Sequence, residues 1–352
     1  MIKQYTQVAI IGAGPSGSIA AALLKQQGVN CIVLEKSLFP RFSIGESLLP
    51  ACMETLKKAN MFEAVNQAGF QFKNGAAFRR CGEYTHFDFT DKYTAGEGTT
   101  FQVQRASFDQ LLAEQAQKQG VDIRYQHTVT AVDLESVQPL LSITDENNIV
   151  YQIQADFILD ASGYGRVLPR LLDLEQPSDF PARKAVFTHV VDNIDADISQ
   201  KMNYDRNKIT IYVHPEHADV WYWLIPFSDG SASVGVVGLP ERFDASLAPI
   251  DTLMNFINQD PNLQRLMKNA TPIGEARSIK GYSADVTKLW GDNFALLGNA
   301  GEFLDPVFSS GVTIAMKSAS LAAPIVKRQL QGNSVDWESE YAKPLKFGVD
   351  TF

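Results

Sequence analysis

The chain has 352 residues, of which 45% are hydrophobic and 20% charged, an ordinary composition for a globular protein with one big or two interlocked domains. Its net charge of −9 argues against nucleic acid or an anionic membrane surface as the main partner. Three cysteines and five histidines lack metal-ligand spacing, so we expect reduced thiols and no metal. The sequence shows no signal-peptide pattern and no run of ~20 apolar residues, so we expect a cytoplasmic protein without a membrane span.

The first predicted elements form a dinucleotide-binding unit. Residues 7–11 are β-branched and apolar, as in a buried parallel strand, and lead into the G-x-G-x-x-G pattern of residues 12–17. Residues 18–27 predict a helix, and residues 31–34 predict a second strand that ends at Glu35, where a ribose hydroxyl needs an acceptor. Glycines let the backbone approach a pyrophosphate, and the helix N-terminus favours its negative charge. The expected cofactor contacts are Gly12, Gly14, Pro15, Ser16, Gly17, Glu35 and Lys36.

Residues 40–50 follow the second strand and are called the strap below. They read P-R-F-S-I-G-E-S-L-L-P. The strap resembles the P-R-x-x-x-G-E-S-L-x-P loop that covers the flavin in two related groups of flavoproteins, the flavin-dependent halogenases and the prenyl reductases. This resemblance supports the superfamily without choosing a branch. The flavin contacts that it implies are Arg41, Ile44, Gly45, Glu46 and Ser47.

Lys73 stands within residues 69–78, in a K-x-G-x-x-F pattern. On composition alone, a lysine is a solvated surface charge. The pattern resembles the segment in which flavin-dependent halogenases place a catalytic lysine at the far end of an internal tunnel. A neutral amine there forms a chloramine with hypohalous acid, whereas an ammonium polarises that acid, and only the first route needs burial to lower the lysine pKa. Residues 79–82 replace the Trp-Gly of many phenol halogenases, so the substrate-side wall stays undefined.

Three later segments favour FAD over NAD. Residues 101–109, 155–163 and 290–300 resemble the signature, the returning strand and the last flavin-contacting turn of FAD-dependent oxidoreductases of the aromatic-hydroxylase superfamily. These proteins usually have Asp where this chain has Asn299, whose amide can still hydrogen-bond a ribityl hydroxyl. The flavin contacts implied are Gln102, Arg105, Val129, Asp160, Ala161, Gly163, Gly298 and Asn299.

Two tryptophans stand two residues apart in the segment Trp221–Pro226. If this segment is extended, Trp221 and Trp223 point to the same face and form one flat aromatic wall. By itself the segment is more simply interpreted as a half-buried strand of a sheet. It resembles the W-x-W-x-I-P motif of flavin-dependent halogenases, whereas prenyl reductases tend to have Tyr first and Phe-Pro last. The resemblance implies that Trp221 and Trp223 keep the substrate away from the flavin, which suppresses hydroxylation.

Residues 303–311 precede the helix-forming run of residues 312–319. Free N–H groups in the first turn of a helix can bind a small anion, with a contribution of roughly 0.3–1 kcal/mol, or up to ~2 when partly buried. The alternative is a plain serine N-cap. The segment resembles the halogenase F-x-x-P-x-x-S-x-G halide site, with Ser309, Ser310 and Gly311 at the halide and Pro306, Gly311 and Val312 at the flavin. Phe308 stands where tryptophan-specific members have Glu, as in phenol and pyrrole halogenases, so it belongs to the predicted catalytic set.

The predicted fold class is α/β, with a Rossmann-type, aromatic-hydroxylase-like FAD-binding domain interleaved with a mixed β-sheet substrate domain. The flavin segments fall in residues 1–50, 100–165 and 285–325, and the substrate domain takes residues 51–99 and 166–284. The strand-like runs 208–213 and 231–237 fit a mixed sheet that carries the tryptophan pair. Residues 326–352 form a C-terminal helical segment, and family members usually continue further, so we expect a minimal lid or a truncated chain.

The resemblance implies a halogenase that uses reduced FAD, O2 and chloride or bromide on a phenolic or pyrrolic ring. Reduced flavin comes from a separate NAD(P)H flavin reductase and forms a C4a-hydroperoxide, whose distal oxygen the halide attacks. The hypohalous acid then travels to Lys73. Three alternatives stay open: a flavin monooxygenase, an oxidoreductase similar to geranylgeranyl reductases, and a flavin-binding relic without activity. The choice of halide, a free or carrier-tethered substrate, and the oligomeric state also stay open.

Overall fold

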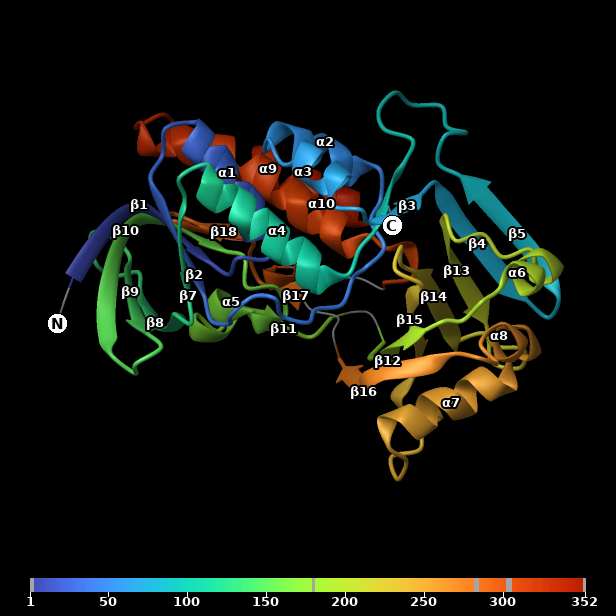
Figure 1. Ribbon diagram of the computed structural model, residues 1–352. Coiled ribbons are helices and arrows are strands. Elements are labelled where there is room, and N and C mark those ends of the chain that lie inside the picture. Colours follow the sequence, from blue (N-terminus) through green and yellow to red (C-terminus); the bar gives the residue numbers. More distant parts are fainter. Residues whose placement is uncertain (1–2, 179–180, 282–284, 302–305, 351–352) are drawn as a thin grey trace.

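The computed structural model describes residues 3–178, 181–281, 285–301 and 306–350. Two large sheets dominate it, one on each side of Figure 1. In the first sheet, β1 pairs in parallel with β2 and β10, β2 with β7, and β10 with β19. Its strands are β18 (Trp290–Gly291), β19 (Phe294–Leu296), β10 (Val150–Asp160), β1 (Lys3–Ile11), β2 (Cys31–Glu35), β7 (Asp122–Tyr125), β8 (Thr128–Asp133) and β9 (Leu140–Thr144). The two predicted strands therefore lie at the centre of a largely parallel sheet, and the glycine turn and helix connect them.

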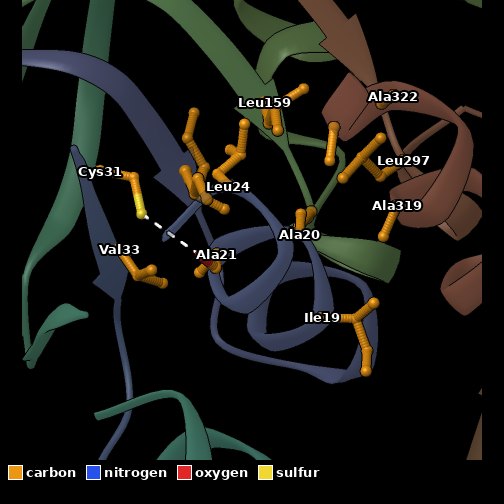
Figure 2. Packing of buried hydrophobic residues seen from close by; sticks show 14 of the residues in the cluster. Ile19, Ala20, Ala21, Leu24, Cys31, Val33, Leu159, Leu297, Ala319 and Ala322 are labelled. Atoms are coloured by element: carbon orange, nitrogen blue, oxygen red, sulfur yellow. Dashed lines mark hydrogen bonds between the residues drawn. The ribbon is translucent and has the colours of Figure 1, made fainter. Parts of the chain in front are cut away.

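Three helices lie along one face of this sheet in Figure 1: α1 (Pro15–Gln26), α4 (Arg105–Lys118) and α9 (Gly311–Leu330). Small side chains allow α1 to approach the sheet and α9 closely. Ala20, Ala21, Ala319 and Ala322 are fully buried, and Figure 2 shows them around α1. The remaining helices of the described chain are α2 (Ala51–Lys58), α3 (Phe62–Gln67), α5 (Val167–Leu171), α6 (Ala196–Met202), α7 (Pro249–Gln259), α8 (Pro261–Leu266) and α10 (Lys343–Asp350).

The second sheet is mixed, as predicted. Neighbouring strands within this sheet run antiparallel, except that β13 and β4 run parallel to each other. Its strands, in order, are β16 (Thr271–Lys280), β12 (Lys184–Val191), β15 (Ser231–Gly238), β14 (Trp221–Pro226), β13 (Lys208–Val213), β4 (Gly75–Arg80) and β5 (Glu83–Asp88). Two short pairs complete the topology, β3 (Gln71–Lys73) with β6 (Thr100–Gln102), and β11 (Glu175–Gln176) with β17 (Asp285–Val286).

Strand β14 is buried on both of its faces. Trp221, Trp223 and Ile225 belong to one apolar cluster, whereas Tyr222 and Leu224 belong to another that includes residues of α7 and α8. The Tyr222 hydroxyl donates a hydrogen bond to the carbonyl of Phe256 on α7, 3.0 Å away. The alternation follows from the two-residue period of a strand. It directs both indoles away from α7 and towards the first sheet's side of the molecule.

Gly235 makes the position of Trp223 possible. It pairs with Trp223 on one side and with Phe187 on the other. A Cβ atom at Gly235 would lie 2.3 Å from Cζ2 of Trp223 and 2.7 Å from Cβ of Phe187. Both neighbours are buried, so neither ring can move freely. Trp223 can therefore occupy its position only because residue 235 has no side chain.

Gly235→Ala should lower the free energy of unfolding by about 1–3 kcal/mol, because an overpacked core forces side chains and backbone to shift. Urea denaturation of both proteins measures the difference. Gly348→Ala is the matched control, since a Cβ atom there meets nothing within 4 Å. Equal denaturation midpoints for Gly235→Ala and the wild type would contradict the tight packing described above.

Candidate active site

A cavity of about 450 Å³ is lined from both sheets. At one end it is bordered by the glycine turn after β1 and by the end of β2. At the other end it is bordered by apolar side chains of β12, β13 and β14. The strap contributes Arg41 through Ser47 to the wall between these ends. The cavity thus brings together segments that are far apart in the sequence.

The glycine turn requires glycine at two positions for steric reasons. Gly12 has a φ of +97°, and a Cβ atom there would lie 2.7 Å from the carbonyl oxygen of Ala161. A Cβ atom at Gly17 would lie 1.9 Å from the carbonyl oxygen of Gly12. Gly14 caps α1 without a side-chain hydrogen bond and lines the cavity, as do Pro15 and Ser16. The N–H groups of the first helical turn are therefore placed to bind a phosphate.

Glu35 joins the second strand to this turn. Its carboxylate accepts hydrogen bonds from the backbone N–H of Ala13 and of Ser37, each at 2.9 Å. Nε of Arg41 lies 3.6 Å from the same carboxylate. Glu35 and Lys36 both line the cavity. A carboxylate has about four acceptor positions, so Glu35 retains capacity for a ribose hydroxyl.

Asn299 presents an unsatisfied polar atom. Its Oδ1 atom is buried and has no hydrogen-bond partner among the described residues, and Asn299 lines the cavity. Gly298 holds it in place, because the Gly298 N–H donates to Oγ of Ser318 at 2.9 Å and a Cβ atom there would lie 2.8 Å from Cα of Ala315. A buried amide oxygen without a partner costs roughly 1–3 kcal/mol. A ribityl hydroxyl would satisfy it, so the wall from Gly12 to Asn299 fits FAD.

The structure divides the predicted flavin contacts into two groups. Those on the cavity wall are Gly12, Gly14, Pro15, Ser16, Glu35, Lys36, Arg41, Ile44, Gly45, Glu46, Ser47, Arg105, Val129, Ala161, Gly163, Asn299, Gly311 and Val312. Gly17, Gln102, Asp160 and Gly298 are fully described but do not form part of that wall. Of Pro306 the structure gives only the backbone, at the start of a short 3-10 helix.

Asp160 and Gln102 have structural partners instead. The Asp160 carboxylate accepts from the backbone N–H of Ser162 at 2.9 Å and of Leu168 at 2.6 Å, and burial raises its pKa. The Gln102 amide is fully buried and donates to the carbonyl of Arg206 at 2.9 Å. Their sequence motifs marked the correct turn and strand. The motifs did not specify which side chains of those segments face the cavity.

The strap is held by side chains from three separate segments. Nη1 of Arg105 donates to the carbonyl of Ile44 at 2.6 Å, while two other nitrogens of the same guanidinium bind the Asp109 carboxylate at 2.7 and 3.0 Å. Nε2 of His189 lies 2.7 Å from Oε1 of Glu46. Burial disfavours the protonated imidazole, but the bond and charge of Glu46 outweigh it and raise the pKa of His189. No local sequence pattern singles out His189.

Lys73 is the third residue that holds the strap. Its Nζ atom donates to Oγ of Ser47 at 2.7 Å and to the carbonyl of Leu48 at 2.8 Å. The Phe89 ring lies on another side, 5.1 Å from Nζ. Lys73 is 1% exposed, and burial lowers the pKa of its ammonium to about 7, although the nearby Cys52 raises it. It is therefore no solvated surface lysine, and it lies behind the cavity wall that Ser47 forms.

The tryptophan pair points into the cavity, and both indoles line it. The prediction that both lie on one face is confirmed, but the prediction of a flat wall is wrong. Their ring centroids are 6.0 Å apart and their planes are tilted by 50°, because Nε1 of Trp223 donates to Oγ of Ser233 at 3.0 Å. Other apolar wall residues were missed by sequence analysis, although strand alternation marks them: Ala185, Phe187, Ile209, Ile211 and Ile225.

The predicted halide segment lies at the N-terminus of α9. Ser309, which has a φ of +61°, and Gly311 line the cavity, whereas Ser310 is buried as the N-cap residue without a side-chain bond. Phe308 is half exposed and lies off the cavity wall. The predicted residues 303–305 lie outside the described residues. A helix of 20 residues whose N-terminus opens on the cavity offers positive potential there.

The described residues contain neither a cluster of metal-ligating side chains nor a helix that could span a membrane. Within residues 3–178, 181–281, 285–301 and 306–350, no group of three or more His, Cys, Asp or Glu side chains is placed to hold a metal ion. No helix in the same part of the chain is both long and apolar enough to cross a membrane.

Comparison with known proteins agrees with this geometry. The family model described as FAD binding domain matches residues 5–335, so the chain is an FAD-binding flavoprotein and an oxidoreductase-type enzyme. It is 30% identical, over 96% of its own length and 80% of the other's, to a 1H-pyrrole-2-carbonyl-(peptidyl-carrier protein) brominase of Pseudoalteromonas luteoviolacea. The chain belongs to the flavin-dependent halogenase family.

Solved structures place it in the same fold. A flavoprotein/dehydrogenase from Cytophaga hutchinsonii superimposes with a TM-score of 0.94 at 42% identity, covering 99% of this chain and 84% of that one. The myxobacterial chondrochloren halogenase CndH superimposes with a TM-score of 0.86 at 30% identity, covering 95% and 77%. The predicted combination of a Rossmann-type flavin fold and a mixed sheet is thereby confirmed.

The buried position of Lys73 predicts a specific pH dependence of stability. Its pKa is about 7 in the fold and 10.5 ordinarily, so the unfolded chain binds more protons between these values. The stabilising contribution is fully present above about pH 10.5 and is lost as the pH falls through about 7. Relative to Lys73→Met, the wild type should gain up to about 1.4 kcal/mol of unfolding free energy per pH unit across this window.

Urea denaturation from about pH 7 to 9.5 measures this difference between wild type and Lys73→Met. Lys201→Met controls for the loss of one lysine, because the Lys201 side chain is 64% exposed. A stability difference between wild type and Lys73→Met that stays constant over this range would contradict a pKa near 7.

Proposed function

We propose that this protein is a reduced-FAD-dependent halogenase that acts on an electron-rich phenolic or pyrrolic ring through hypohalous acid and Lys73. The observation that carries the proposal is the buried lysine. Lys73 bonds to a residue of the flavin cavity wall, Ser47, and its pKa near 7 gives a substantial fraction of neutral amine at neutral pH. Membership of the halogenase family supports the same reaction class.

Bound in its reduced form, FAD would give two electrons to O2, and halide would give the other two as it is oxidised to hypohalous acid. The whole reaction balances as ArH + X⁻ + H⁺ + O2 + FADH2 giving ArX + FAD + two H2O. In this proposal a separate NAD(P)H flavin reductase supplies FADH2. Reduced nicotinamide is an intracellular reductant, which fits a cytoplasmic location.

The residues of the chain divide the remaining tasks. Ser309 and Gly311, at the N-terminus of α9, hold the halide on the cavity wall. Trp221 and Trp223 line the apolar end of the cavity, where their indoles keep a bulky aromatic substrate from the flavin. Ser310 and Phe308 belong to the same segment but do not line the cavity. Lys73 delivers the halogen to the substrate on the far side of the strap.

The substrate of one relative suggests a specific class. The Pseudoalteromonas luteoviolacea relative is a brominase of a pyrrole carbonyl held on a peptidyl carrier protein. We propose a pyrrolic or phenolic acyl group, delivered on a carrier protein, as the substrate and bromide or chloride as the halide. A phenol or pyrrole ring loses its proton readily after electrophilic attack, which fits Phe308 in place of a carboxylate.

The proposal predicts halide-dependent product formation that needs Lys73. Wild-type protein with reduced FAD, O2, bromide and a simple phenol or pyrrole should give brominated product by mass spectrometry. Lys73→Ala should lose at least about 100-fold of that product while it still oxidises reduced FAD. Lys208→Ala is the matched control, because Lys208 is also buried but binds Asn74 and Asp205 rather than the strap. Undiminished turnover by Lys73→Ala would contradict the proposal.

A second candidate function is favoured by the apolar end of the cavity. Phe187, Ile209, Ile211 and Ile225 line the same cavity as the flavin contacts, whereas Lys73 lies outside it. An apolar substrate bound there would lie beside the flavin, as a flavin monooxygenase or a reductase similar to geranylgeranyl reductases requires. The apolar end of the cavity would then hold the substrate instead of excluding it.

Two assays separate this second candidate from halogenation. Hydroxylated product that forms without halide would identify a monooxygenase, and product that forms without O2 would identify an alkene reductase. Under both alternatives Trp223→Ala should change substrate affinity directly, because its indole borders the substrate.

Failure of the purified protein to bind FAD at all, measured by quenching of flavin fluorescence, would identify a relic without activity.

A further inference from the structure

Ser47 connects the flavin cavity to Lys73. Among the described residues, it is the one that both lines the cavity and hydrogen-bonds to Lys73. The other bonding partner of Lys73, Leu48, accepts through its carbonyl and has a fully buried side chain off the cavity wall. The Ser47 hydroxyl is therefore a direct hydrogen-bonded link between the cavity wall and Lys73.

The Ser47 hydroxyl is held in a defined orientation. The backbone on both sides of it is fixed, because Val103 N–H donates to the Glu46 carbonyl at 2.7 Å and Leu48 N–H donates to the Phe101 carbonyl at 3.1 Å. Ser47 itself pairs with Gln102 in an isolated antiparallel bridge. The strap backbone is therefore held at this point, and the bond from Nζ of Lys73 positions the hydroxyl oxygen.

The proton of this hydroxyl has no acceptor within the described part of the chain. Oγ accepts from Nζ of Lys73, and a hydroxyl that accepts one bond can still donate another. Ser47 is 4% exposed, so bulk water does not reach its hydroxyl. Its proton is therefore available to a molecule bound in the cavity that Ser47 lines. A buried donor of this kind favours a guest that carries an acceptor oxygen.

We infer that Ser47 is a catalytic residue that hands hypohalous acid from the flavin cavity to Lys73, an inference that rests on the proposed halogenase function. Its hydroxyl donates to the oxygen of the acid while its Oγ accepts from the lysine nitrogen. The N–X bond forms as the O–X bond breaks, and the oxygen leaves as water. That water takes its second proton from Ser47, which takes one from Lys73, so HOX and R–NH2 become R–NHX and H2O.

The alternative role for Ser47 is only to satisfy a buried lysine. Both roles predict some loss of stability in Ser47→Ala, so stability does not separate them. They differ in what happens to the oxidant. A relay residue controls how much hypohalous acid reaches Lys73, whereas a merely structural acceptor leaves that fraction unchanged for every flavin that is oxidised.

The experiment measures this fraction directly in the full chain. Wild type, Ser47→Ala and Ser47→Thr react with reduced FAD, O2 and bromide in the presence of a simple phenol and a soluble β-diketone that traps free hypohalous acid. In Ser47→Ala the ratio of brominated phenol to brominated trap should fall about tenfold or more, because the proton relay is lost. Ser47→Thr keeps a hydroxyl at the same atom and should restore the ratio to within a few-fold of wild type.

Each outcome decides one question. An unchanged ratio in Ser47→Ala, with wild type active, overturns the role of Ser47 and leaves the proposed function standing. A wild type that brominates neither the phenol nor the trap, although it oxidises reduced FAD, overturns the proposed function itself. The ratio is normalised to oxidant formed, so a weaker affinity of Ser47→Ala for FAD does not alter its meaning.

Discussion

The position of the strap is the constraint on which the rest of the site depends. Residues 40–50 carry no regular element of their own, yet Arg105, His189 and Lys73 bind it from three different segments. Each partner belongs to a different part of the fold: a helix on the parallel sheet, a strand of the mixed sheet, and the short strand β3. The strap therefore connects the wall of the flavin cavity to the buried lysine.

The burial of Lys73 is costly, and this cost is informative. An ammonium in a site with 1% exposure loses its hydration, and two neutral acceptors replace only part of it. No carboxylate forms an ion pair with Lys73 among the described residues, unlike Arg105 beside Asp109. A methionine would fill the space at a lower energetic cost, but it could not donate to Ser47 and Leu48, so the lysine secures the strap at the expense of its own hydration. Under the proposed function, the same burial supplies a nucleophilic amine near neutral pH.

The sequence predicted those features that depend on local order, and it failed where distant segments meet. The strand, glycine turn and helix around residues 12–17 follow from contiguous residue types, and so does the common face of Trp221 and Trp223. The tilt between the indoles depends on Ser233, ten residues away on β15. The contact of His189 with Glu46 spans 143 positions, and no local pattern encodes it. Asp160 stands in the correct motif but faces its own turn, a rotamer choice that spacing cannot reveal.

The shape of the cavity explains why one fold can support different flavin reactions. The glycine turn, Glu35 and Asn299 line the cavity and would serve any reaction that uses FAD, because they would hold its phosphate, ribose and ribityl groups. The apolar end decides whether a substrate reaches the flavin, and there the indoles of Trp221 and Trp223 stand 6.0 Å apart in the cavity wall. If their rings fill that end, only an oxidant as small as hypohalous acid can leave the flavin and act elsewhere. Under the proposed function, the buried amine behind Ser47 receives that oxidant, so exclusion by the indoles and reaction at Lys73 are parts of one mechanism.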